Sequence, residues 1–163
     1  MNTQTTLFIL AAISLGNATT LDSAFAAESY HSDAAATKAV KFAPGIITTD
    51  GNFEINTVFN NAGNKVLFAR CADDFSKCTM LESDYVNGQW QEPVAFAFSG
   101  DYLEADPYYN EDESFVYFVS KRPTKDTEQI ASSVNLWRIS VLENGWGDPE
   151  YLPSLSSDAD DLY

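Results

Sequence analysis

Carboxylates are the most numerous side chains in this sequence that could do chemistry. The chain has 24 Asp and Glu against 9 Lys and Arg and a single His, for a formal net charge of −15. Two acidic groups stand out: residues 111–113, and the group Asp158, Asp160 and Asp161. Carboxylate oxygens suit Ca²⁺, but neither group has the spacing of an EF-hand loop. We interpret both as solvated turns, keep Asp158, Asp160 and Asp161 as the calcium candidates, and expect no cofactor.

Catalytic groups find little support elsewhere in the chain. The sequence has no Gly-x-Ser-x-Gly motif, and His31 lies in a polar segment without periodicity, where we assign it no role. Glycosidases use two carboxylates at a defined separation. In so acidic a chain, however, carboxylate pairs are expected whether or not the protein is a glycosidase, so their presence does not indicate this activity. We therefore expect no enzyme activity within this sequence.

The two cysteines, Cys71 and Cys78, have six residues between them along the chain. In an exported protein such a pair indicates a disulfide. A zinc site is the alternative, but two cysteines alone would leave it half-built.

The N-terminus has the pattern of a secretory signal peptide over residues 1–26. An apolar stretch at 7–15 is too short to span a bilayer and is followed by the small-x-small pattern at 24–26. Residues 1–6 carry no Lys or Arg, so a buried strand or helix of a cytosolic protein is the alternative. We predict a periplasmic or secreted protein, with no membrane insertion after removal of the signal. The negative charge disfavours nucleic acid as a partner.

The rest of the chain repeats itself with a spacing of about fifty residues. After a linker or arm at 27–52, we divide it into units at 53–103 and 104–160, with a third unit beginning at 161–163. Each unit contains four strand candidates: 54–60, 64–70, 78–86 and 92–97 in the first, and 104–109, 114–120, 134–142 and 149–153 in the second. Asn-Gly at 87–88 and at 144–145 predicts a hairpin in each unit.

These residues resemble the WD40-like repeats of PD40/TolB-type bacterial β-propeller proteins. The similarity is carried by residues 104–109, by 115–123 (Phe-Val-Tyr-Phe-Val-Ser-Lys-Arg-Pro), by 135–139 and by 145–149. It implies an all-β fold with two complete four-stranded antiparallel propeller blades and the start of a third. Where the family has a Ser-Pro-Asp-Gly turn, this chain has Asn-Ala-Gly-Asn at 61–64 and Glu-Asp-Glu-Ser at 111–114. Glu113 aligns with Gly63 and favours a left-handed backbone far less, so the second turn type stays open.

Two blades leave apolar faces uncovered. We therefore predict either a fragment of a larger propeller or self-association through the exposed blade faces. Repeated aromatic residues are expected in the core: Trp90, Trp137, Trp146, Tyr108, Tyr109 and Tyr117.

The function expected from these features is an exported, non-catalytic module that binds a protein, peptide or glycan ligand in the bacterial envelope. The loops at 98–103 and 121–133 are the binding candidates. The alternative is part of a propeller-containing hydrolase, either a sialidase-like glycosidase or a peptidase with a propeller gating domain, whose catalytic part lies outside this sequence.

Overall fold

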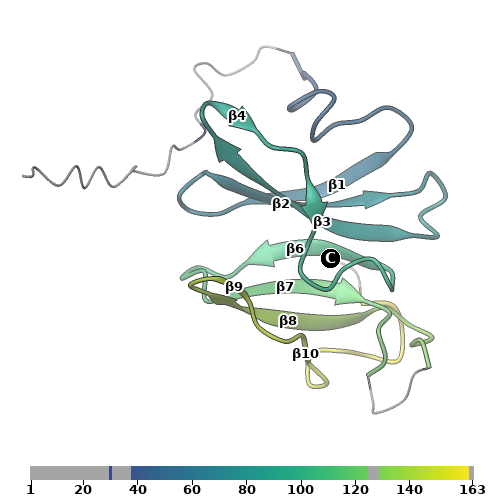
Figure 1. Ribbon diagram of the computed structural model, residues 1–163. Coiled ribbons are helices and arrows are strands. Elements are labelled where there is room, and N and C mark those ends of the chain that lie inside the picture. Colours follow the sequence, from purple (N-terminus) through teal and green to yellow (C-terminus); the bar gives the residue numbers. More distant parts are fainter. Residues whose placement is uncertain (1–29, 31–37, 125–128, 162–163) are drawn as a thin grey trace, which may run out of the picture.

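The computed structural model describes residues 30, 38–124 and 129–161 (Figure 1). The predicted signal peptide, His31 and the last two residues of the predicted third unit lie outside this range. The described residues form ten β-strands and no helix, which confirms the all-β expectation. Within the same range, no helix is long and apolar enough to cross a membrane.

The strands form two antiparallel sheets of the same design, one above the other in Figure 1. The first contains β1 (Phe53–Phe59), β2 (Lys65–Cys71), β3 (Cys78–Val86), β4 (Gln89–Trp90) and β5 (Val94–Ala95). The second contains β6 (Glu104–Tyr109), β7 (Phe115–Ser120), β8 (Asn135–Leu142), β9 (Gly145–Trp146) and β10 (Glu150–Tyr151). Each of the eight strand candidates contains or overlaps one of these strands. The short β4 and β9, which follow the hairpin turns, are additions.

Both sheets carry a β-bulge at the same place in their first strand. The pairing of β1 with β2 shifts between Ile55 and Val58, and that of β6 with β7 shifts fifty residues later. The bulged residues Asn56 and Asp106 are left-handed, with φ of 50° and 56°. The Asn56 amide donates a hydrogen bond to the Asp106 carboxylate, so the two bulges also join the sheets.

The turn after the first strand is likewise built twice. Gly63 and Glu113 both have positive φ, 67° and 55°, so Glu113 adopts the conformation that its residue type disfavours. Side-chain caps compensate, because the Asn60 and Asn110 Oδ1 atoms each accept the backbone N–H five residues on, at 3.0 and 2.8 Å. The doubt about the second turn is resolved: its backbone follows the first.

A buried acid at the start of each first strand holds an arginine. In the first sheet the Glu54 carboxylate accepts from Arg70 Nε at 3.0 Å. In the second, Glu104 is fully buried and accepts from Arg122 at 2.6 Å and from the Ser120 hydroxyl at 3.3 Å. The two glutamates are fifty residues apart, whereas the two arginines are fifty-two residues apart, so the arginine lies two positions later in the second unit.

The main core lies between the two sheets. Ala69 and Met80 are cross-strand partners, and Leu67 lies two residues before Ala69 on β2. Because side chains two apart on a strand share a face, Leu67 and Met80 lie on the same face of the first sheet. That face packs on the second sheet in a cluster of fully or nearly buried residues: Leu67, Met80, Phe96, Tyr109, Val116, Phe118, Trp137 and Ile139.

The opposite face of the first sheet is covered by the arm. Residues 38–52 form no strand, but Ile47 is 1% exposed and packs with Phe42 over Val66, Phe68 and Trp90. Figure 1 shows this segment, in dark blue, on the side of the first sheet away from the second. Arg70 Nη2 donates to the carbonyls of Ile46 and Ile47, at 3.2 and 3.1 Å, and holds the arm in place.

The arm imitates the end of a repeat unit. Phe42-Ala43 and Phe96-Ala97 are the same dipeptide, and both alanines have positive φ, 40° and 38°. Phe42 lies over the first sheet as Phe96 lies over the second. In each case, the segment just before a sheet covers the same face of that sheet.

Candidate binding site

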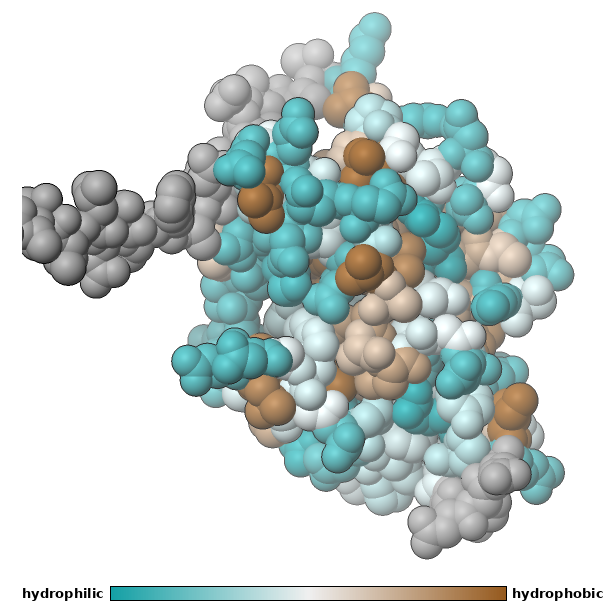
Figure 2. Space-filling model, viewed as in Figure 1, coloured by the Kyte–Doolittle hydropathy of each residue, from teal (hydrophilic) through white to brown (hydrophobic). Residues whose placement is uncertain are grey.

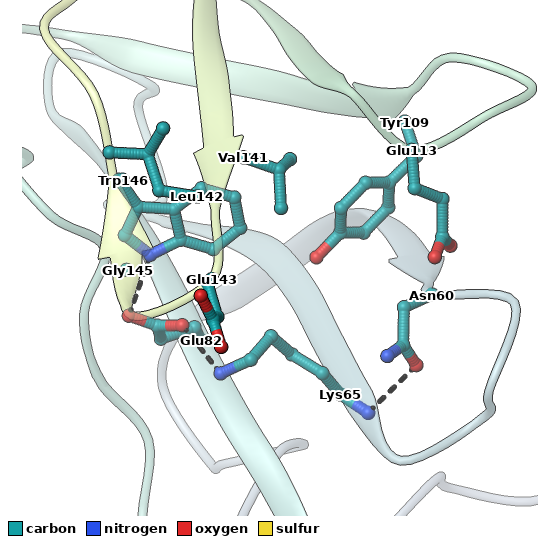
Figure 3. A pocket seen from close by; sticks show the side chains of 10 residues that line it. All are labelled: Asn60, Lys65, Glu82, Tyr109, Glu113, Val141, Leu142, Glu143, Gly145 and Trp146. Atoms are coloured by element: carbon teal, nitrogen blue, oxygen red, sulfur yellow. Dashed lines mark hydrogen bonds and ion pairs between the residues drawn. The ribbon is translucent and has the colours of Figure 1, made fainter.

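A pocket of about 360 Å³ opens where the turns of the two sheets meet (Figure 3). Its walls come from the β1–β2 turn, the start of β2, the middle of β3, the β6–β7 turn and the β8–β9 hairpin. The lining residues are Asn60, Lys65, Glu82, Tyr109, Glu113, Val141, Leu142, Glu143, Gly145 and Trp146. The pocket therefore depends on the stacking of the two sheets.

The pocket is acidic despite its one lysine. Lys65 Nζ lies 2.8 Å from both Glu82 Oε2 and Asp84 Oδ1. Burial acts to lower the pKa of Lys65, but the hydrogen bonds to Asp84 and Glu82 outweigh it and the pKa is raised. Lys65 is thus a fixed cation that two carboxylates already neutralise. Glu113 and Glu143 also line the pocket and leave it with net negative charge.

Two aromatic rings form the apolar walls. Trp146 Nε1 donates to Glu82 Oε1 at 3.3 Å, which fixes the indole against β3. Its ring lies 6.5 Å from that of Tyr109. Burial, followed by the charges of Glu113, Glu82 and Asp84, raises the pKa of Tyr109 far above its ordinary value, so the phenol stays neutral. Aromatic faces beside carboxylates form a site for an organic cation.

The sequence did not predict this pocket. Of the loops predicted to bind ligand, residues 100–103 of the first and Lys121 and Ile130 of 121–133 line a separate pocket of about 460 Å³ at the other end of the sheets. Two features singled out in the sequence lie at the acidic pocket: the acidic group 111–113, which we interpreted as a solvated turn, and Trp146, which we interpreted as core. Trp146 is instead only half-buried and accessible from the pocket.

The other aromatic residues divide between core and surface. Trp90, Trp137 and Tyr109 are buried, as expected for core residues. Tyr108 is 58% exposed, so the core prediction is wrong for this residue. It follows the bulge in β6, which turns it to the face that no other sheet covers. Tyr117 is half-buried on that face.

Cys71 and Cys78 form the predicted disulfide, which confirms that interpretation. The two residues are direct cross-strand partners at the end of β2 and the start of β3. The bridge therefore closes the loop 72–77 at its base.

The calcium candidates take part in local hydrogen bonds. Asp160 Oδ1 accepts from the backbone N–H of Val134 at 2.7 Å, and Asp161 accepts from Ser157 Oγ at 2.8 Å. Asp158 is exposed. Among the residues that the structure describes, no group of three or more His, Cys, Asp or Glu is placed to hold a metal ion.

Comparison of the chain with protein-family models, curated proteins and solved structures found no match.

Proposed function

We propose that this chain is an exported binding module whose two sheets stack as propeller-type blades, and that its acidic pocket receives a basic side chain of a protein or peptide ligand. The stacking proposal is supported by the matched bulges, turns and acid–arginine pairs of the two sheets. It is supported equally by their arrangement, since the equivalent face of each sheet is covered by the segment that precedes it in the chain. Repeated units that cover one another in this way are typical of propellers and other repeat architectures.

The acidic pocket is the observation that carries the binding proposal. A lysine or arginine side chain has an apolar stem and a charged head. The stem suits the walls formed by Trp146 and Tyr109, and the head suits the carboxylates of Glu113 and Glu143. Contact between a cation and an aromatic face adds to this attraction.

The charge of the whole molecule favours the same ligand class. A net charge of −15 attracts basic partners over distances of about 10 Å at ordinary ionic strength. Figure 2 shows a mostly hydrophilic face on which hydrophobic side chains are largely scattered. Binding driven by charge and a few anchoring contacts therefore fits this surface better than a broad apolar interface.

The disulfide supports an oxidising compartment, which is consistent with export. The ligand we propose is accordingly a basic segment of another envelope or secreted protein.

Calorimetric titration with a tetra-arginine amide tests the proposal, with a tetra-citrulline amide as the neutral counterpart of the same shape. We expect binding of the arginine peptide only, and a loss of roughly fivefold in affinity for Glu113→Gln/Glu143→Gln. The double variant Asp73→Asn/Glu92→Gln removes the same charge outside the pocket and controls for general attraction. Equal losses in the two double variants, or equal binding of both peptides, would overturn the proposal.

A further inference from the structure

A second pocket lies at the opposite end of the sheets from the acidic one. It is formed by the β2–β3 loop, the β5–β6 loop and the two ends of the β7–β8 loop, and its volume is about 460 Å³. This size lies within the range typical of small-molecule sites. Its lining includes two lysines, Lys77 and Lys121, and two aromatic residues, Phe75 and Tyr102.

The two lysines are unusual in this acidic molecule because neither forms an ion pair with a residue that the structure describes. Lys41, Lys65, Arg70, Arg122 and Arg138 each form an ion pair. Among the Lys and Arg that the structure describes, only Lys38, Lys77 and Lys121 have no ion-pair partner within the described residues. Two of these three line the same pocket, although carboxylates outnumber cations by more than two to one in the chain.

The aromatic wall is held in a conformation that the residue type disfavours. Phe75 has φ of 55°, in the left-handed region, where a bulky side chain is a genuine outlier. Phe75 is nevertheless 46% exposed, and its ring contacts that of Phe53 at 5.6 Å between centroids, so burial in the core does not account for this conformation. A strained, exposed aromatic residue at the mouth of a pocket is a basis for inferring function.

The surrounding loops are tied together. The disulfide closes the loop that carries Phe75 and Lys77, and Phe75 N–H donates to the Ala72 carbonyl at 2.9 Å. Lys121 N–H donates to the Leu103 carbonyl at 3.0 Å, which joins the other two loops. The lysines and rings are thus presented from a fixed framework, which lowers the entropic cost of binding.

We propose that this pocket is a second binding site, for a small organic monocarboxylate with a flat apolar body. The ammonium groups of Lys77 and Lys121 take the carboxylate, and Phe75 and Tyr102 contact the flat body. A single negative charge fits best, because the field of a molecule with net charge −15 repels polyanions and Asp101 also lines the pocket. The ligand class is therefore opposite in charge to that of the acidic pocket.

Benzoate and benzamide form a matched pair of probes, of the same shape but different charge. In the full mature protein, we expect millimolar benzoate to shift the backbone amide NMR signals of residues 75–77, 100–103 and 121, and benzamide to bind much more weakly. Lys77→Gln/Lys121→Gln should weaken benzoate binding roughly tenfold, as expected for a lost charge-assisted hydrogen bond. Phe75→Ala should weaken both probes.

The control variant is Lys38→Gln, which removes one exposed lysine outside the pocket and should leave benzoate binding unchanged. The substituted lysines are not in the core, so we expect each variant to fold. Amide signals that are unchanged outside the pocket will show that it has folded. Equal binding of benzoate and benzamide, unaltered benzoate affinity in the double lysine variant, or no shifts with benzoate would each overturn the proposal.

Discussion

Replacing Arg122 with methionine should destabilise the protein more than the equivalent change at Arg70. Arg122 Nε and Nη2 both donate to Glu104 Oε1, at 3.1 and 2.6 Å. The guanidinium also lies over the rings of Phe98, Tyr102 and Trp137, at 4.3, 5.3 and 5.5 Å from their centroids. Methionine fills much of the same volume but cannot neutralise the carboxylate.

The magnitude follows from burial. Glu104 is 0% exposed, and the side chain of Arg122 is 14% exposed. Removing one partner of a buried pair costs about 3–5 kcal/mol, because the remaining charge is left without compensation. The equivalent variant in the first sheet, Arg70→Met, should cost only about 1–2 kcal/mol, because the arginine side chain is 24% exposed and its partner 8% exposed. Water can replace part of that interaction.

Urea unfolding followed by circular dichroism measures these free energies. The double variant Glu104→Leu/Arg122→Met should recover at least about 2 kcal/mol relative to Arg122→Met, since no buried charge remains. A loss below about 1 kcal/mol for Arg122→Met, or a double variant no more stable than the single one, would refute the assignment of the pair as a buried, mutually dependent unit.

Three further changes test other parts of the fold. Ile47→Ala should cost about 2–4 kcal/mol in urea unfolding although Ile47 lies in no strand, whereas Val40→Ala, at a position 77% exposed, should have little effect; equal costs would show that the arm does not pack as described. Replacing Cys71 and Cys78 with serine should lower the free energy of unfolding by about 2.5 kcal/mol, and a reductant should then have no additional effect on the variant. Asp106→Asn should stabilise the protein at pH 7 by about 0.5–1 kcal/mol, because desolvation raises the pKa of Asp106 and disfavours its charged form. This gain in the free energy of unfolding should shrink as the pH falls below the pKa that Asp106 has in the folded protein. A constant gain between pH 7 and pH 3 would contradict desolvation as the cause.

The strands could be predicted from sequence because each has its own local signal. The apolar runs of β2 and β7 and the two Asn-Gly dipeptides recur at a regular spacing, and repetition strengthens every individual assignment. The disulfide could be predicted from the presence of two cysteines in a chain that was expected to be exported. These features depend on neighbours in sequence or on composition alone.

Features that depend on tertiary contacts were missed. The arm at 38–52 has no periodicity because its buried residues come from irregular backbone, and only its likeness to 96–97 could have indicated its role. In the second unit the arginine lies at 122, two positions after the one equivalent to Arg70. This difference in register hid an acid–arginine pair that the structure forms in both sheets. The acidic pocket joins residues from 60 to 146, so no local pattern could reveal it.

The positions of the three tryptophans make the molecule its own optical reporter. Trp90 packs beneath the arm, Trp137 lies against the Arg122 guanidinium, and Trp146 lines the acidic pocket between the sheets. The fluorescence of each indole therefore depends on a different set of contacts within the protein. Variants that keep one tryptophan at a time would let fluorescence emission follow the loosening of the arm, the rupture of the buried ion pair and the separation of the sheets as distinct events.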